Sequence, residues 1–78
     1  MDKDLKNNVY NHLEKFAKNL KFERESRHLT QKDVADKLGI KTQSYQAYEG
    51  GISLPTTENL IKLTLIFDLS LDELFEIK

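Results

Sequence analysis

Apolar side chains recur at helical spacing along the first third of the chain. The stripe is formed by Leu5, Val9, Leu13, Phe16 and Leu20. These positions follow one another in steps of three or four residues, which matches the turn of an α-helix, about 3.6 residues. No glycine or proline interrupts the stretch, so we predict one helix from about residue 4 to residue 27.

The next segment has the pattern of a short, capped helix. Asp33 follows Thr30 by three residues, so the hydroxyl and the carboxylate can satisfy free backbone N–H groups at a helix start. Gly39 can adopt positive φ without a Cβ penalty and should end this helix. The buried side is predicted to be Val34, Ala35 and Leu38.

A third helix is predicted from Lys41 or Thr42 to about Glu49, where the glycine pair at 50–51 stops it. Tyr45 lies on one side, together with Tyr48 one turn later, and polar residues occupy the rest. A fourth helix should begin after Pro55, with a threonine at 56 or 57 as its cap.

The fourth helix is expected to end at Asp68 and to be mostly buried. Its inward positions are predicted to be Leu60, Ile61, Leu63, Thr64 and Phe67, and its outward positions Glu58, Asn59 and Lys62. Ser70 and Glu73 form a second capping box, ahead of a short fifth helix that contains Leu71, Leu74 and Phe75. The fold class is therefore all-α, with five helices.

The joint between the second and third helices is the most informative feature. Two short helices joined by a tight turn cross closely, so the crossing admits only a small side chain and the turn favours positive φ. Ala35 and Gly39 fit these two needs. The inner faces are predicted to be Val34, Leu38, Ile40, Tyr45 and Tyr48. One side of the third helix is then left free.

Composition limits the class of protein. The chain has 78 residues, 38% of them hydrophobic and 32% charged, and no cysteine. These values predict a single folded domain that is soluble and has no disulfide or thiolate metal site, which suits the cytoplasm. The amino terminus lacks the pattern of a secretory signal, and no segment reaches the length of a membrane span.

The charge is unevenly distributed, although its sum is only −1. Residues 1–41 hold ten Lys and Arg against seven Asp and Glu, whereas residues 42–78 hold two against six. A basic end can attract phosphates while the acidic end stays away from them. Any affinity for a nucleic acid should therefore be modest and sensitive to salt.

The combined pattern resembles the Cro-like, or XRE, helix-turn-helix family of phage repressors and related bacterial regulators. The matching residues are Leu29-Thr30-Gln31, Val34-Ala35, Leu38-Gly39, Glu49, Gly51, Pro55, Leu60 and Leu71-Asp72-Glu73-Leu74. The resemblance runs from about residue 16 to residue 75 and implies a compact, lambda-repressor-like domain. We therefore expect a helical extension over residues 1–15 and a helix-turn-helix domain over residues 16–75.

The resemblance also implies a double-stranded DNA site and the residues that form it. Gln31 would touch a phosphate, and Thr42, Gln43 and Ala47 would face base edges. The site would also include Ser44 and Gln46 beside them and Lys41 before them. Glutamine can bond adenine bidentately, and threonine and alanine methyl groups can contact the thymine methyl, so a preference for A·T pairs is expected. A solvated helix face is the plainer interpretation of the same polar residues.

Three departures from the family pattern bear on specific expectations. Asp68 stands where glycine or asparagine is common after the fourth helix, and it should be neutral because aspartate tolerates the left-handed region. Lys41 stands where a serine or threonine usually caps the third helix, so the cap could move to Thr42 and shift the site by one residue. Ile52, Ser53 and Leu54 occupy positions where many relatives carry basic residues. Phosphate contacts are therefore expected to be sparse.

Arg24 and Glu49 are expected to form a structural ion pair. Arg24 follows Leu20 by one turn on the buried side, and the resemblance pairs it with the carboxylate at the end of the third helix. Two separate, solvated charges are the alternative. The phenol rings of Tyr45 and Tyr48 are expected in the core, although aromatic faces can also stack on single-stranded bases.

We expect neither enzymatic activity nor a cofactor, metal or small-molecule site. His12 and His28 are separated by sixteen residues, and no third ligand converges on them. No nucleophile, base and orienting group come together in the sequence.

The apolar stripe extends about three turns beyond the part that the repressor core needs. Residues 5 to 13 could pack against the fifth helix and its tail around Phe75 and Ile77, cover a second copy of the chain, or form a solvated arm. A two-fold homodimer would suit a palindromic operator with half-sites about 34 Å apart.

Two functions from different classes are consistent with these observations. The first is a sequence-specific transcriptional regulator, most simply a repressor that blocks transcription by occupying its operator. The second is a protein-interaction module on the same scaffold, of the antitoxin or anti-repressor type, with weak or no DNA binding. The small number of basic residues near the third helix favours the second function.

Overall fold

The computed structural model describes residues 3–77 and is built from helices, with no strand in that range. They are α1 (Lys3–Ser26), α2 (Gln31–Leu38), α3 (Thr42–Glu49), α4 (Thr57–Phe67) and α5 (Leu71–Phe75). The five predicted helices are confirmed, with ends that differ by one or two residues. Residues 1 and 2 of the predicted extension lie outside the described range.

Side-chain caps begin three of the helices. The Thr30 hydroxyl accepts from the N–H of Asp33, and the Asp33 carboxylate accepts from the N–H of Thr30. Ser70 and Glu73 form the same reciprocal pair at α5. At α4 the cap is Thr56, whose hydroxyl accepts from the N–H of Asn59. Each cap satisfies backbone donors that have no partner within the helix.

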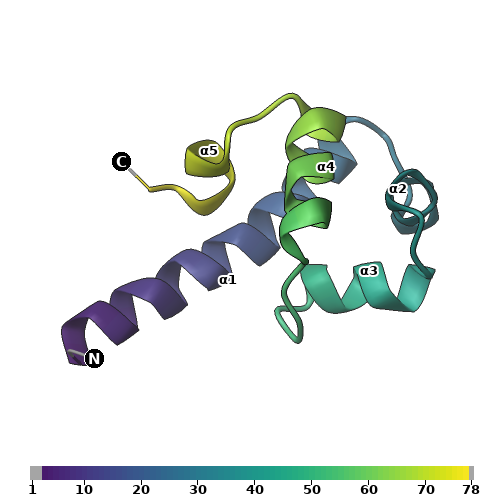
Figure 1. Cartoon of the computed structure of the whole chain (residues 1–78). Helices are drawn as coiled ribbons and strands as arrows, with labels where there is room; N and C mark the ends of the chain where they lie inside the picture. Colours follow the sequence, from purple (N-terminus) through teal and green to yellow (C-terminus); the bar gives the residue numbers. More distant parts are fainter. Residues whose placement is uncertain (1–2, 78) are drawn as a thin grey trace.

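Left-handed residues end α2 and α4, as the sequence predicts. Gly39 has φ 74°, and Asp68 has φ 55°. The backbone N–H of Ile40 then reaches the carbonyl of Ala35 at 3.0 Å, which closes the corner between α2 and α3. The chain turns within three residues, so the two helices meet at a sharp angle (Figure 1).

The core lies where α1, α2, α3, α4 and α5 converge. Its buried hydrophobic residues are Phe16, Leu20, Val34, Ala35, Leu38, Tyr45, Tyr48, Leu63, Phe67 and Leu74. Ala35 is fully buried at the helix crossing, which agrees with the need for a small side chain. Burial of these groups supplies most of the stabilisation of so small a domain.

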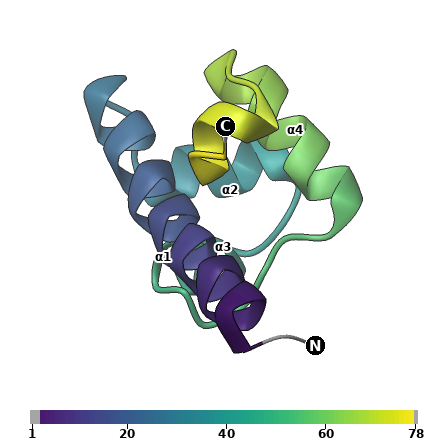
Figure 2. The same cartoon turned by 90° about the vertical axis from the view of Figure 1, so that its left-hand side faces the viewer.

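The first half of α1 projects from the body of the molecule, as Figures 1 and 2 show. The apolar stripe is buried only at Phe16 and Leu20; Leu13 is half-buried, and Leu5 and Val9 are exposed. The longest dimension of the molecule, 38 Å against 22 and 20 Å for the other two, reflects this projection.

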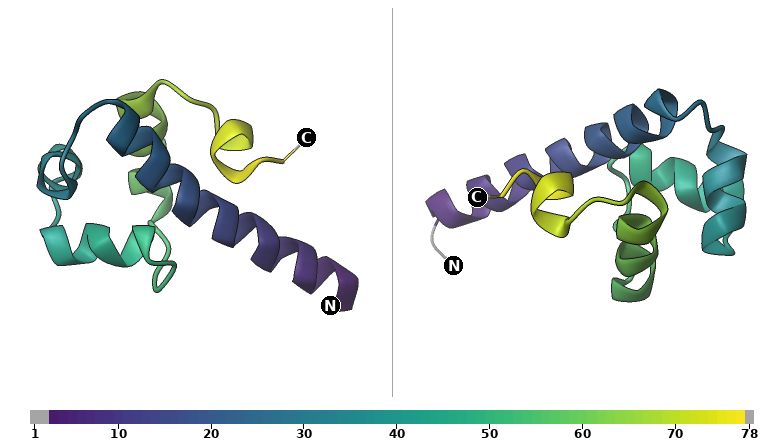
Figure 3. Two further views of the ribbon diagram at one scale, coloured as in Figure 1. Left: turned by 180° about the vertical axis from the view of Figure 1, so that it is seen from behind. Right: turned by 90° about the horizontal axis from the view of Figure 1, so that it is seen from above.

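α5 packs on the middle of α1, at His12, Phe16 and Asn19. The predicted packing of the apolar residues Leu5 and Val9 on α5 is not found, because both are exposed. The rings of Phe16 and Phe75 are stacked with centroids 4.3 Å apart. Nδ1 of His12 donates to the carbonyl of Phe75 at 2.7 Å, and Asn19 donates to the carbonyl of Leu74 at 2.8 Å. Figure 3 shows α5 beside α1 in both views, well short of the amino-terminal end.

Two of the positions predicted for α4 are wrong. Asn59 is buried, with 8% of its surface exposed, because its side-chain amide donates to the hydroxyl of Tyr48 at 3.1 Å. Ile61, which was expected to be buried, is 53% exposed. The buried side of α4 is therefore rotated so that a polar contact with α3 lies inside.

Candidate nucleic-acid interface

α3 presents two chemically different faces. Tyr45 and Tyr48 are buried against the core, with their rings in an edge-to-face contact at 6.1 Å. Gln43, Ser44 and Gln46 are exposed, and Thr42 and Ala47 are half-buried. The structure therefore brings the six site residues predicted between 41 and 47 to one short segment that is open to the outside, with aromatic rings behind it.

Lys41 is the N-cap of α3, and its side chain makes no capping hydrogen bond. The predicted shift of the cap to Thr42 is therefore wrong, because α3 begins at Thr42 and the residue before it has the extended backbone of an N-cap. Thr42 stays in the first turn of the helix. The exposed ammonium group of Lys41 is the one basic group between residues 41 and 49.

Gln31, at the start of α2, lies against α3. Its Nε2 donates to Oε1 of Glu49 at 3.2 Å, and its Oε1 accepts from Nε2 of Gln46 at 3.1 Å. Sequence reasoning placed Gln31 and Gln46 in the same site but did not predict this contact between them. No sequence pattern could predict this contact, because it joins α2 to α3 and depends on how the turn between them places the two helices.

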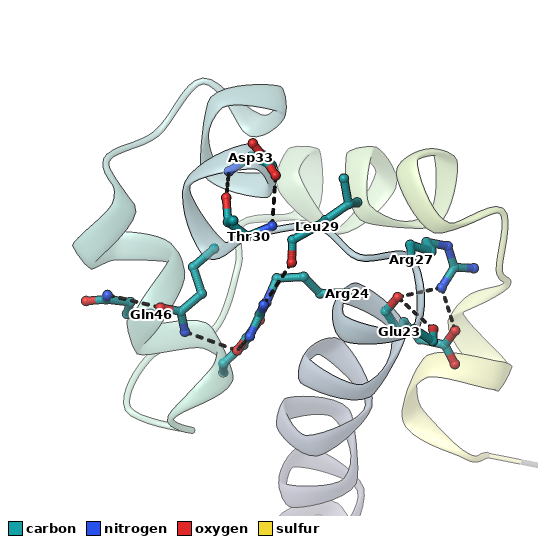
Figure 4. Close-up of polar contacts among 10 residues, drawn as sticks. Glu23, Arg24, Arg27, Leu29, Thr30, Asp33 and Gln46 are labelled. Atoms are coloured by element: carbon teal, nitrogen blue, oxygen red, sulfur yellow. Dashed lines mark hydrogen bonds and ion pairs between the residues drawn. The ribbon is translucent and has the colours of Figure 1, made fainter.

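Arg24 and Glu49 are brought together by the packing of α1 against α3. Nε of Arg24 donates to Oε2 of Glu49 at 2.7 Å, and Nη2 donates to Oε1 at 3.0 Å. The remaining Nη1 donates to the carbonyl of Leu29 at 3.0 Å, as Figure 4 shows. The side chains are 10% and 4% exposed, so the pair is desolvated and its geometry is fully bidentate.

The protonation of this pair follows from its surroundings. Burial by itself would raise the pKa of Glu49, but the hydrogen bonds it accepts, with that from Arg24 the strongest, bring the pKa below its ordinary value. The hydrogen bond to Glu49 likewise raises the pKa of Arg24. Both groups are charged at neutral pH, and the end of α3 is fixed to α1.

Both tyrosine hydroxyls lie inside the domain. The hydroxyl of Tyr48 is paired with Asn59 inside the core. The hydroxyl of Tyr45 is buried without a hydrogen-bond partner, the one such side-chain atom in the described part of the chain, and burial raises the pKa of this phenol. Both rings therefore serve packing and are closed to bases.

Basic side chains near the corner are partly committed to other contacts. Lys32 pairs with Asp36 at 2.8 Å, and Lys62 pairs with Glu58 at 3.3 Å. Arg27 pairs with Glu23, as Figure 4 shows, and donates to the carbonyl of Phe67 at 2.6 Å.

Residues 3–77 were also searched for membrane-spanning helices and for clusters of metal ligands. No helix in that range is long and apolar enough to cross a membrane. No group of three or more His, Cys, Asp or Glu side chains is placed there to hold a metal ion.

Known proteins share this sequence pattern. The helix-turn-helix family matches residues 20–74, which is most of the chain, so the chain belongs to that family. It is 42% identical over 60 residues to the cryptic phage CTXphi transcriptional repressor RstR of Vibrio cholerae serotype O1, covering 77% of this chain and 54% of the repressor. It is 46% identical over 61 residues to the uncharacterized HTH-type transcriptional regulator YqaE of Bacillus subtilis, covering 78% of this chain and 53% of that regulator.

The chain thus spans about half the length of these two relatives. No solved structure matches it significantly.

Proposed function

We propose that this domain binds double-stranded DNA by inserting the exposed face of α3 into the major groove, and that it regulates transcription, as a repressor, by occupying an operator. The main support is the geometry of α3, which is a polar helix face open to the outside and braced by two buried rings and a bidentate ion pair. The names of the two relatives support the same function for this chain. Such a regulator acts in the cytoplasm.

Individual residues have distinct roles in this proposal. Thr42, Gln43 and Ala47 face base edges and favour A·T pairs, with Ser44 and Gln46 beside them. Lys41, at the start of α3, contacts a phosphate. Gln31 donates one amide N–H to Glu49. Its second N–H can donate to a phosphate of the DNA backbone.

We further propose that the functional unit is a homodimer on a palindromic operator. Leu5 and Tyr10 are each more than half exposed on the projecting part of α1, and Val9 is 43% exposed. A groove lies between this part of α1 and the segment after α3, lined by Tyr10, Leu13, Glu14, Phe16, Ala17, Tyr48, Gly51, Ile52, Ser53 and Leu54. A second copy of the chain would remove this apolar surface from water.

The same groove supports the second candidate function, a protein-interaction module with weak or no DNA binding. An apolar groove on a helical domain can receive an amphipathic helix of a partner protein. The absence of Lys and Arg between residues 42 and 49 also favours this candidate.

Salt-titrated binding to a random-sequence duplex distinguishes the two candidates. A DNA-binding domain should bind at low salt and lose affinity steeply as salt rises, because phosphate contacts release counterions. With the few basic groups available, we expect a slope that corresponds to about two to four phosphate contacts per subunit. The proposed function is wrong if no binding occurs even at low salt; the interaction module then remains.

A further inference from the structure

The two ends of α3 differ in the charge that the neighbouring chain supplies. At its start, Lys41 is exposed and its ammonium group makes no capping hydrogen bond. At its end, the segment 52–54 carries no charge, and the pair of Arg24 and Glu49 neutralises itself. An eight-residue helix is about 12 Å long, which is also about the width of the major groove. Both ends of α3 therefore come near a DNA backbone when its outer face lies in the groove.

α1 passes the end of α3, and two contacts fix which of its residues lie there. A Cβ placed on Gly51 would lie 4.0 Å from the Cβ of Ala17, so α1 touches the segment that follows α3. Arg24 pairs with Glu49 in the last turn of α3. Lys21 comes four residues after Ala17 and three before Arg24. It is within one helical turn of both contacts, and so lies beside the end of α3.

The position of Lys21 around the axis of α1 places it on the outer side of α3. The buried residues Phe16 and Leu20 mark the direction of the core. At about 100° per residue, Ala17 and Arg24, which face α3, lie about 70° further round the axis. Lys21 lies about 50° beyond them in the same sense, and its side chain is exposed. From the core, one therefore passes α3 before reaching Lys21, on the side to which the outer face of α3 is turned.

The ammonium group of Lys21 is not committed to another charge. No acidic side chain within residues 3–77 pairs with it, and this includes Glu25 one turn further along α1. Lys32 and Lys62, by contrast, are each paired with a carboxylate one turn away. A free ammonium group on a flexible stem binds a phosphate as a point charge, without the fixed geometry that a guanidinium group requires.

We propose that Lys21 of α1 contacts a DNA phosphate at the end of α3 opposite Lys41, so that α1 supplies the cation that the segment 52–54 lacks. The two ammonium groups then hold the backbone of DNA at both ends of α3. A phosphate contact carries no direct sequence information, so Lys21 contributes to affinity and to the position of α3, and base preference stays with α3. The inference rests on the proposed function, because it concerns the same DNA-binding surface.

Lys15 is a matched control within the same helix. It is exposed and has no ion pair within residues 3–77. At about 100° per residue, it lies about 170° round the axis of α1 from the positions that face α3. Its side chain therefore leaves the helix away from the proposed DNA surface, although its substitution changes the net charge by the same amount as that of Lys21.

The test measures the affinity for a random-sequence duplex as salt is varied, for wild type, Lys21→Gln, Lys41→Gln and Lys15→Gln. Thermal unfolding checks that each variant keeps its fold. Lys21→Gln should reduce the salt slope by about one per subunit and weaken binding to all sequences alike, as should Lys41→Gln. Lys15→Gln should keep the slope of wild type. On a duplex recovered by selection, ethylation of one phosphate should cease to matter in Lys21→Gln, and ethylation of a different phosphate in Lys41→Gln.

Two results would overturn the role of Lys21 alone. One is a Lys21→Gln protein with the slope of wild type, and the other is a Lys15→Gln protein that loses as much, which would mean a general effect of net charge. A wild-type protein that binds no duplex even at low salt overturns the proposed function, and the role of Lys21 with it.

Discussion

At the scale of single residues, Glu49 organises the corner of the domain. Its carboxylate accepts from Arg24 and Gln31, and so links α3 to both α1 and α2. A buried charge is tolerated only when it is paired and its hydrogen-bonding capacity is filled. The same arrangement makes the end of α3 rigid, so the position of the proposed recognition face depends on one ion pair.

Removing one partner of this pair should be costly. Arg24→Met or Glu49→Gln should each lower the free energy of unfolding by about 3 kcal/mol, because an uncompensated charge or an unfilled donor stays buried. The double variant should lose less than the sum of the two single losses. Urea unfolding of the four proteins measures the coupling, and a coupling energy near zero would show that the two groups do not interact energetically.

The pair also predicts a pH dependence of stability. The pKa of Glu49 is lower in the folded than in the unfolded protein, where it is near 4.5, so the unfolded chain binds more protons as the solution becomes acidic. The contribution is complete above that value and is lost as the pH falls through the lower, folded pKa. Asp33, whose pKa is lowered by its capping hydrogen bonds to Thr30, acts in the same direction. Unfolding midpoints measured from pH 7 to pH 3 should be flat at first and then fall. Glu49→Gln should show a shallower fall, and a fall as steep as that of wild type would contradict this role.

At the scale of secondary-structure elements, the sequence predicts best what is decided locally. The caps at Thr30 and Ser70 and the turn at Gly39 depend on residues within four positions of each other, and each is found where the pattern indicates. The orientation of α4 depends instead on what packs against it. The buried amide of Asn59 could not be predicted because its partner, the Tyr48 hydroxyl, belongs to another helix.

The candidate site shows the same division. Periodicity alone indicates that residues 42, 43, 46 and 47 share the outer face of α3. The contact of Gln31 with Gln46, by contrast, depends on the angle between two helices. That angle follows from the burial of the Ala35 and Tyr45 side chains, a property of the whole core.

A substitution at Lys41 can separate two roles of the start of α3, helix capping and phosphate binding. Its side chain provides no cap, so Lys41→Ser should add a hydrogen bond to a free backbone N–H and raise the free energy of unfolding by about 0.5–1 kcal/mol. The same change removes a phosphate-binding ammonium group and should reduce the salt slope of DNA binding by about one per subunit. Chemical unfolding and salt titration measure the two effects. A more stable protein with an unchanged slope would mean that Lys41 does not touch the backbone of DNA.

At the scale of the whole molecule, the projecting half of α1 carries apolar side chains that the core does not bury. Phe16 is the first buried residue of α1, and Leu5, Val9 and Tyr10 before it are exposed. Tyr10 also lines the groove that contains Ile52 and Leu54. Apolar surface of this kind is commonly an interface. The proposed homodimer makes it one.

Charges placed on this surface should therefore dissociate the dimer. Leu5→Glu combined with Val9→Glu should be monomeric by sedimentation at protein concentrations where wild type is dimeric. Phe22→Glu is the matched control, because Phe22 is also an exposed apolar residue of α1 but lies beyond the groove. Equal masses for wild type and the double variant would show that the projecting half of α1 is not the contact between subunits.

The central claim is that the outer face of α3 is the surface that meets DNA. It is tested most directly by following backbone and side-chain amide resonances of the labelled protein while a duplex recovered by selection is added. The largest shifts should fall on residues 41–47 and on the side-chain amides of Gln31, Gln43 and Gln46. Shifts confined to α1 and the segment around Ile52, with α3 unchanged, would contradict the claim.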